Sequence, residues 1–403
     1  MKKYIRYILT VVIIVCNLFS VTVTAFAGGG DSDNSIYTNA ESDEPTDPGA
    51  LQLESKSAVL MEVASGQVFY EMNANERMSP ASITKVMTLL LTMEAIETGK
   101  IGLDDMPVCS ERASAMGGSQ IWLEVGEQMS VDHLLKAVCM ASANDASLML
   151  AEHVAGSEEV FVDMMNKRAA DLGMVNTNFV NTTGLDAPNH YSTAYDIALM
   201  SAELLKHPLI KEYSVIWMDS LRNGEISLVN TNRLVRFYEG ATGLKTGTTD
   251  GAGKCLSASA ERGGMELVAV TLGSDTSDQR FNTARVLLDY GFANWELTSP
   301  PDFHEEISPV KVLKGIQETV EIEKPEMNPI IVERGRQSDI TYTVDIAEDV
   351  EAPVEKGQVL GKISVRLDDQ EISSISLGAA ESIEKITFFK ALGILTKSFI
   401  NFS

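Results

Sequence analysis

The sequence predicts an α+β domain built on an antiparallel sheet, followed by a small all-β domain and a C-terminal amphipathic helix. From about residue 53 to residue 300, strand patterns stand at both ends and helical patterns fill the middle. Beyond the tandem Pro300-Pro301, over residues 301–380, short alternating strands with glycine turns follow one another without a long helix. Residues 381–403 return to helical periodicity.

The first 27 residues have the layout of a secretory signal peptide. Three basic residues precede an uncharged apolar run that ends in Ala25-Phe26-Ala27, a small-residue cleavage site. An uncleaved membrane anchor is the alternative, because residues 7–27 are nearly long enough to span a bilayer. In both cases we expect the rest of the chain to be exported. Residues 28–52 then form an acidic linker.

The composition argues against several classes of protein. There are 57 acidic and 32 basic residues, and this charge of -25 repels nucleic-acid phosphates, so we expect no nucleic-acid partner. Cys109, Cys139 and Cys255 remain after the signal peptide, an odd number without a C-x-x-C pair. We therefore expect no disulfide framework and no metal knuckle. The five histidines form no H-E-x-x-H motif, and we expect neither a metal nor a cofactor.

Each element of the first domain follows from its local pattern. The helix over 79–99 is apolar on all sides, which is typical of a buried helix. Ser79 can cap it, Pro80 suits its first turn and Gly99 suits its end. The other expected elements are two strands within 57–73 around Ser65-Gly66, helices over 132–156 and 192–208, and a hairpin over 254–274 that turns at Gly263-Gly264.

The second domain and the C-terminus have different patterns. The all-β domain shows alternating strands within 319–323, 328–334, 339–346 and 359–367. On a helical wheel of the final segment, one broad face collects Ile386, Phe388, Phe389, Leu392, Leu395, Phe399, Ile400 and Phe402. Charged residues interrupt the longer apolar runs, which argues against a spanning helix. We expect it to lie on the outer face of the cytoplasmic membrane, with packing on the protein as the alternative.

The first turn of the buried helix at 79–99 contains Ser82 and Lys85. Residues three apart lie on the same face of a helix. A serine hydroxyl becomes a nucleophile when a base removes its proton, and a lysine can do so when burial or a nearby cation lowers its pKa. The same spacing occurs at Ser308–Lys311 and Ser382–Lys385, so alone it is a weak signal.

Two further motifs strengthen the signal. Ser142-Ala143-Asn144 follows an apolar helical stretch, and Lys245-Thr246-Gly247 directly precedes the hairpin. This trio, in this order, is typical of penicillin-binding proteins and class A β-lactamases. A second serine and a second lysine would supply a proton path and a cation that lowers the pKa of Lys85.

With these motifs the chain resembles the low-molecular-mass penicillin-binding proteins, the serine-type D-alanyl-D-alanine carboxypeptidases. The resemblance runs from about residue 53 to the C-terminus and includes "SPASITKVMT", "MASANDASLMLAEHVAG", "NTTGLD", "NHYSTAYDIALMS" and "GLKTGTTDGAGKCLSASAERGGMELVAVTLGS". It implies a β-lactamase/DD-peptidase-like domain with a helical subdomain. It also implies removal of the terminal D-Ala from peptidoglycan pentapeptides, and β-lactam antibiotics as acylating inhibitors.

The resemblance implies a role for nine residues. Ser82 would attack the carbonyl between the two D-alanines, and Lys85 would take its proton. Ser142 and Lys245 would relay a proton toward the leaving amine. On the substrate side, Asn144 would hold a peptide amide, and Lys245 and Thr246 would bind the terminal carboxylate. Gly247 would let the strand edge approach the peptide, and the backbone of Thr248 would share the oxyanion hole with the backbone of Ser82. Arg280 would steer the carboxylate.

Two other functions are open from the sequence. A class A β-lactamase shares the motifs, but its expected Glu-x-x-x-Asn is absent from residues 145–245. A non-catalytic wall-binding scaffold is the second alternative, and the intact motifs argue against it. The motifs do not distinguish a carboxypeptidase from an endopeptidase that cuts cross-links.

Overall fold

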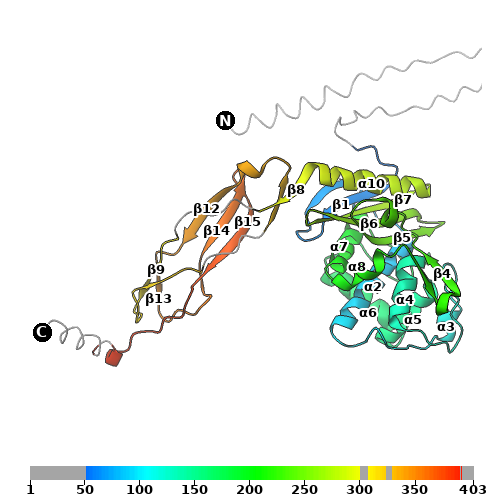
Figure 1. Ribbon diagram of the computed structural model, residues 1–403, viewed down its shortest axis with the longest axis horizontal. Coiled ribbons are helices and arrows are strands. Elements are labelled where there is room, and N and C mark those ends of the chain that lie inside the picture. The colour runs from blue at the N-terminus through cyan, green and yellow to red at the C-terminus, as the bar shows by residue number, and fades with distance from the viewer. Residues whose placement is uncertain (1–50, 300–306, 324–328, 391, 393–403) are drawn as a thin grey trace, which may run out of the picture. The chain divides into compact units, whose positions relative to one another are not determined.

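A computed structural model describes residues 51–299, 307–323, 329–390 and 392 (Figure 1). The predicted signal peptide and most of the acidic linker lie outside the described residues. The α+β fold predicted from the sequence is confirmed. Its first domain is built on one antiparallel sheet, and the second domain contains only strands and one short turn of helix among its described residues.

A five-stranded sheet forms the centre of the first domain, in the order β2-β1-β7-β6-β5. The expected hairpin turns at Gly263-Gly264, where both residues have positive φ, a conformation that glycine adopts without strain. The N-terminal strand β1 pairs with β7, so the two ends of the domain meet in the middle of the sheet. The strands are β1 (Ser57–Glu62), β2 (Val68–Met72), β5 (Ala241–Thr249), β6 (Gly253–Arg262) and β7 (Met265–Ser274).

Both faces of this sheet are covered by helices (Figure 1). Because side chains alternate along a strand, Ala58 and Leu60 of β1 enter the core under α10 (Ser277–Asn294), while Val59 and Met61 enter the core of the helical subdomain. All six residues of β1 are consequently buried. The sheet is the middle layer of three.

The helical subdomain is arranged around α2, which is buried along most of its length. The segment predicted as helix over 192–208 is confirmed as α7, and the helix over 79–99 is present as a 3₁₀ turn followed by α2. The elements are η1 (Ala81–Thr84), α2 (Lys85–Glu97), α3 (Glu111–Ser114), α4 (Val131–Lys136), η2 (Ala137–Ala141), α5 (Asn144–Ala155), α6 (Glu158–Asp171), α7 (Ala194–Leu205), α8 (Pro208–Ser214) and α9 (Leu234–Phe237), with the hairpin β3 (Met218–Leu221) and β4 (Ile226–Val229) joined by η3 (Arg222–Gly224).

The prediction of one helix over 132–156 is wrong in its middle. The helix widens into the π-turn η2, breaks at Ser142 and Ala143, and begins again as α5. Ser142 has φ 61°, a left-handed conformation that no α-helix can continue through. The break places the Ser142 side chain between two helix ends.

The second domain consists of short strands with two small cores. β8 precedes the tandem proline and pairs with β11, so the pairing of this domain includes residues before Pro300. The elements are β8 (Trp295–Thr298), β9 (Val310–Leu313), β10 (Thr319–Val320), β11 (Ile330–Glu333), η4 (Gln337–Asp339), β12 (Thr341–Ile346), β13 (Asp349–Glu351), β14 (Val359–Leu367) and β15 (Gln370–Gly378).

The predicted start of the C-terminal helix at Glu381 is wrong. Residues 381–387 are not helical, because bridges from Ile383 to Val354 and from Lys385 to Gly315 tie them to the second domain. Helix begins at Phe388, and of the segment beyond Lys390 only Leu392 is described. Over the part of the chain that is described, no helix has the length and apolar character needed to cross a bilayer.

Candidate active site

The turn that carries Ser82 is fixed by the residues packed around it. Ser82 is the only partly exposed residue between Pro80 and Met93. Ala81, directly before it, has φ 48°, which is strained for a residue that carries a Cβ. The expected capping by Ser79 is wrong, since its hydroxyl donates to Asp186 at 2.9 Å and neither η1 nor α2 has a side-chain cap.

Lys85 lies one turn after Ser82 and is completely buried. Its Nζ donates to Ser82 Oγ at 3.0 Å and to the Thr183 carbonyl at 2.8 Å. Burial, and then the positive charge of Lys245, hold the pKa of Lys85 well below its usual range, although Asp145 opposes the shift. A lysine with a depressed pKa, in contact with a serine hydroxyl, can accept the serine proton.

Lys245 is the second buried cation of this region. It lies on the edge strand β5 with 1% of its surface exposed, and its Nζ donates to the Thr246 carbonyl at 3.1 Å. Burial lowers its pKa to about 7; Arg280 adds to this effect and Cys139 opposes it. Two buried ammonium groups that share one region cannot both remain charged near neutral pH without cost.

Ser142 and Asn144 each present a buried oxygen that has no hydrogen-bond partner among the described residues, Ser142 Oγ and Asn144 Oδ1. The rest of Asn144 is fixed, because its Nδ2 donates to Gly117 O at 2.6 Å and its backbone N–H donates to Ser119 O at 2.7 Å. Buried polar atoms are rarely left unpaired, and such atoms in a native structure call for an explanation. A bound peptide would supply partners for both.

Strand β5 brings the third motif, Lys245-Thr246-Gly247, against the turn that carries Ser82. A Cβ on Gly247 would lie 3.0 Å from Pro80 O and 3.1 Å from the Ala81 Cβ, so any larger residue would crowd this close approach. Thr246 Oγ1 donates to Thr231 Oγ1 at 2.8 Å, and the Thr231 N–H donates to Met140 O. The strand is therefore linked both to the turn of Ser82 and to the segment before Ser142.

Arg280 lies behind β5 with its guanidinium committed to protein atoms. One nitrogen donates to Gly247 O at 3.0 Å and to Thr248 Oγ1 at 3.2 Å, and the side chain is 8% exposed. Its Nε is buried without a partner within the described part of the chain. Burial lowers its pKa to about 10, with a contribution from Arg233. The expected steering of a carboxylate would have to act through its charge or after these bonds rearrange.

Several residues at the site had no role assigned from the sequence. The loop 181–190 supplies the Thr183 carbonyl to Lys85, and Asp186 accepts from Ser79. His190 Nδ1 accepts from the Val180 N–H, so its Nε2 carries the proton and donates to Thr84 Oγ1 at 2.8 Å. Residues 181–186 of this loop are the "NTTGLD" segment of the family resemblance, but a backbone carbonyl that accepts a hydrogen bond has no side-chain signature in a sequence.

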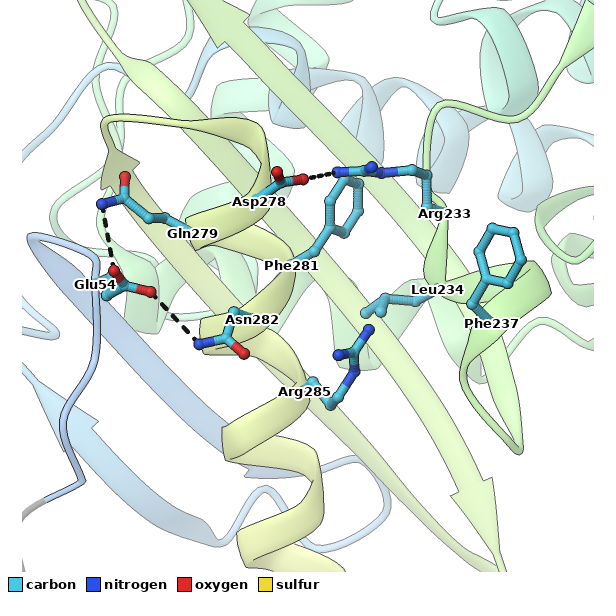
Figure 2. Close-up of a pocket in the computed structure, with 9 residues that line it drawn as sticks. All are labelled: Glu54, Arg233, Leu234, Phe237, Asp278, Gln279, Phe281, Asn282 and Arg285. Carbon is cyan, nitrogen blue, oxygen red and sulfur yellow. Dashed lines mark hydrogen bonds and ion pairs between the residues drawn. The ribbon is translucent and has the colours of Figure 1, made fainter.

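A separate pocket of about 530 Å³ lies beside α10 and contains none of the nine predicted residues (Figure 2). Most of its polar side chains pair with one another: Arg233 with Asp278, and Glu54 with Gln279 and Asn282. This pocket is linked to the candidate active site by the positive charge of Arg233, which contributes to lowering the pKa of Arg280. As for metals, no cluster of three or more His, Cys, Asp or Glu side chains suited to an ion occurs in the described ranges.

Comparison with known proteins agrees with this geometry. The family described as D-alanyl-D-alanine carboxypeptidase matches residues 41–276, which is more than half of the chain. The chain belongs to this family. It is a serine-type carboxypeptidase, as the motifs indicated. The family described as penicillin-binding protein 5, C-terminal domain, matches residues 297–385 of the carboxypeptidase.

Relatives match it over most of their length. The D-alanyl-D-alanine carboxypeptidase DacF of Bacillus subtilis is 43% identical, over 86% of this chain and 91% of the relative. The crystal structure of penicillin binding protein 5 from Haemophilus influenzae has a TM-score of 0.74 at 33% identity, over 83% of this chain and 99% of that one. Penicillin-binding protein D2 of Listeria monocytogenes, solved in an ampicillin-bound form, is 32% identical with a TM-score of 0.55, over 60% and 99%. The β-lactamase and scaffold alternatives are not favoured.

Proposed function

We propose that this carboxypeptidase removes the terminal D-Ala from peptidoglycan pentapeptides through an ester formed on Ser82. The observation that supports it best is the pair of hydrogen bonds made by the fully buried Lys85, to Ser82 Oγ at 3.0 Å and to the Thr183 carbonyl at 2.8 Å. Neither hydrogen-bond partner is a carboxylate, and the charge of Asp145 only partly offsets burial and the charge of Lys245, so the neutral amine that a general base requires is favoured.

The acylation step uses these groups in sequence. Ser82 Oγ bonds to the carbonyl carbon of the penultimate D-Ala while its proton passes to Lys85. The peptide C–N bond then breaks, and the leaving amine receives a proton by way of Ser142 and Lys245. Ser142 Oγ suits a proton relay because it makes no hydrogen bond to any protein atom among the described residues. Water then hydrolyses the ester and frees Ser82.

Substrate recognition relies on the remaining predicted residues. Asn144 Oδ1, a buried acceptor without a partner in the described residues, would accept a peptide N–H. Lys245 and Thr246 would bind the terminal carboxylate. The backbone N–H groups of Ser82 and Thr248 would form the oxyanion hole, a contribution of ~3 kcal/mol per donor in such sites. Arg280 would add positive charge from behind Thr248.

We also propose that β-lactams acylate Ser82, by likeness to the Listeria protein solved with ampicillin. The enzyme would be exported and would lie on the outer face of the cytoplasmic membrane as a peripheral protein. The secretory layout of residues 1–27 and the apolar face after Phe388 support this location. Phe388 and Phe389 are 76% and 82% exposed, as a bilayer-contacting segment requires.

The test compares Ser82→Ala with Ser308→Ala, whose exposed serine belongs to a Ser-x-x-Lys pair in the second domain. We expect Ser82→Ala to abolish both D-Ala release from purified peptidoglycan and covalent labelling by fluorescent penicillin, with an unchanged melting temperature. Ser308→Ala should retain both. A stable penicilloyl adduct on the Ser82→Ala enzyme would exclude Ser82 as nucleophile, and cleaved cross-links in place of free D-Ala would identify an endopeptidase.

A further inference from the structure

The carboxylate of Asp186 joins two segments that are far apart in the sequence. Its Oδ1 accepts from Ser79 Oγ at 2.9 Å and from Thr249 Oγ1 at 2.8 Å, and its Oδ2 accepts from the Gly251 N–H at 3.3 Å. Ser79 lies three residues before Ser82, and Thr249 directly follows Thr248. Both oxygens of Asp186 thus accept hydrogen bonds from the two segments.

The loop that carries Asp186 is itself fixed against the nucleophile turn. Gly184 has φ +82°, and a Cβ there would lie 1.7 Å from Ala81 O, so the loop backbone presses on the strained residue before Ser82. Asn181 Oδ1 accepts from the Gly184 N–H at 2.7 Å, and Asn181 Nδ2 donates to Leu185 O at 2.9 Å. Asp186 therefore projects from a loop whose backbone is hydrogen-bonded and closely packed.

The two segments joined by Asp186 are those that supply the oxyanion donors. The Ser82 N–H comes from η1 and the Thr248 N–H from β5, so their separation depends on how these elements are held together. Neighbouring side chains on a strand point to opposite faces. Arg280 contacts Thr248 from one face, and Asp186 contacts Thr249 from the other. The end of β5 is held from both sides.

We propose that Asp186 is a positioning residue that sets the distance between the two oxyanion donors. The inference rests on the oxyanion hole of the proposed function and adds a residue to it. Asp186 is itself exposed, so its hydrogen bonds contribute little to folding compared with a buried group. Hydrogen bonds from Thr249, Ser79 and Gly251 outweigh partial burial and lower its pKa, which keeps it ionised at neutral pH.

The first test is the rate of Ser82 acylation by fluorescent penicillin in Asp186→Ala and Asp186→Asn. Misplacing one oxyanion donor should slow acylation by about 10- to 100-fold in Asp186→Ala, with the affinity of the initial complex changed less than about twofold. Asp186→Asn keeps an oxygen for Ser79 and Thr249 and should recover most of the rate; because it is also uncharged, it separates geometry from charge. Asp250→Ala, which removes an exposed carboxylate one residue from Thr249, is the matched control and should be unaffected.

The second test asks whether the two contacts act through Asp186. Ser79→Ala should slow acylation in the wild-type background and have no further effect in the Asp186→Ala background. Thr249→Val should slow acylation more in the wild-type background than in the Asp186→Ala background, where it removes only the hydrogen bond from the Ala252 N–H. Additive effects in both backgrounds, or a wild-type acylation rate in Asp186→Ala, would overturn the inference. The proposed function would be untouched by that result, because it is tested separately, by adduct formation in Ser82→Ala and by the products released from peptidoglycan.

Discussion

At the scale of single residues, the proposed site contains two buried lysines with depressed pKa values, Lys85 and Lys245. Burial is the main cause for both, and for Lys85 the charge of Lys245 is the second cause. A cation nearby disfavours protonation of its neighbour, so each lysine influences how much of the other is neutral at a given pH. Lys245 is thereby expected to act on Lys85 as well as on the substrate carboxylate.

We predict that Lys245→Ala shifts the acid limb of the pH–rate profile to higher pH. Removing the neighbouring positive charge favours the protonated form of Lys85, so its pKa rises and less neutral base is present at pH 7. Acylation by penicillin should fall by about tenfold or more at pH 7 and recover in part at alkaline pH. Rates are measured between pH 6 and pH 10 beside Lys100→Ala, an exposed lysine. If the rate falls at every pH and the acid limb does not shift, Lys245 would have a role in binding only.

Ser142 shows how backbone strain and chemistry meet at one residue. Its φ of 61° is unfavourable for serine by about 1 kcal/mol, and glycine would relieve this strain. We predict that Ser142→Gly and Ser142→Ala both lower D-Ala release by about 100-fold, as expected for loss of a proton-transfer group. In thermal unfolding, Ser142→Gly should be more stable than Ser142→Ala by about 1 kcal/mol. Equal stabilities would show that the left-handed conformation is not retained without the hydroxyl.

At the scale of elements, the loop 181–190 supports the turn that carries Ser82. His190 is 5% exposed and joins this loop to Thr84. Burial lowers its pKa from the usual 6.5 to about 4, although Asp186 opposes this. The folded protein therefore contains neutral His190 at any pH well above 4.

This gives a prediction for stability against pH. Below about 6.5 the unfolded chain binds a proton at His190 that the folded protein does not bind until about pH 4, so the unfolded state is favoured as the pH falls. The contribution is fully present above about 6.5 and decreases between 6.5 and 4 by up to about 3 kcal/mol. Urea unfolding of the wild type and of His190→Asn at pH 7 and pH 5 measures it. The variant should be less stable at pH 7 but lose less on acidification; parallel losses would contradict the assignment.

At the scale of the whole molecule, the segment after β15 has two parts, one packed in the second domain and one exposed. Ile383 is 1% exposed and lies in a core of the second domain, whereas Phe388 and Phe389 are exposed. The amphipathic pattern from residue 381 onward is real in the sequence, but its first part pairs as strand. A periodic pattern alone does not reveal which partner its apolar face will find.

We predict that a chain ending at Thr387 remains folded and active but leaves the membrane fraction. Removing the exposed phenylalanines would remove the proposed apolar contact with the bilayer. A chain ending at Ala380 should also leave the membrane but unfold more easily, because loss of a buried isoleucine costs about 2–5 kcal/mol. Fractionation of cells and thermal unfolding separate the two variants. If the chain ending at Thr387 still sediments with membranes, the N-terminal segment is the anchor.

Local spacing determined much of this protein. The Ser82–Lys85 contact follows from i,i+3 geometry in a helix, and the sheet hairpins follow from alternation and glycine turns, because both depend on residues close in the sequence. Tertiary structure alone decided the break at Ser142, the direction of Arg280 and the support of Lys85. The hydrogen bonds that support the turn of Ser82 and Lys85 join residues that are far apart in the sequence. Lys85 and Thr183 are separated by 98 positions, and Thr84 and His190 by 106. Such contacts depend on how buried polar groups find partners once the chain is packed, and a pKa is set by that packing rather than by neighbours in the sequence.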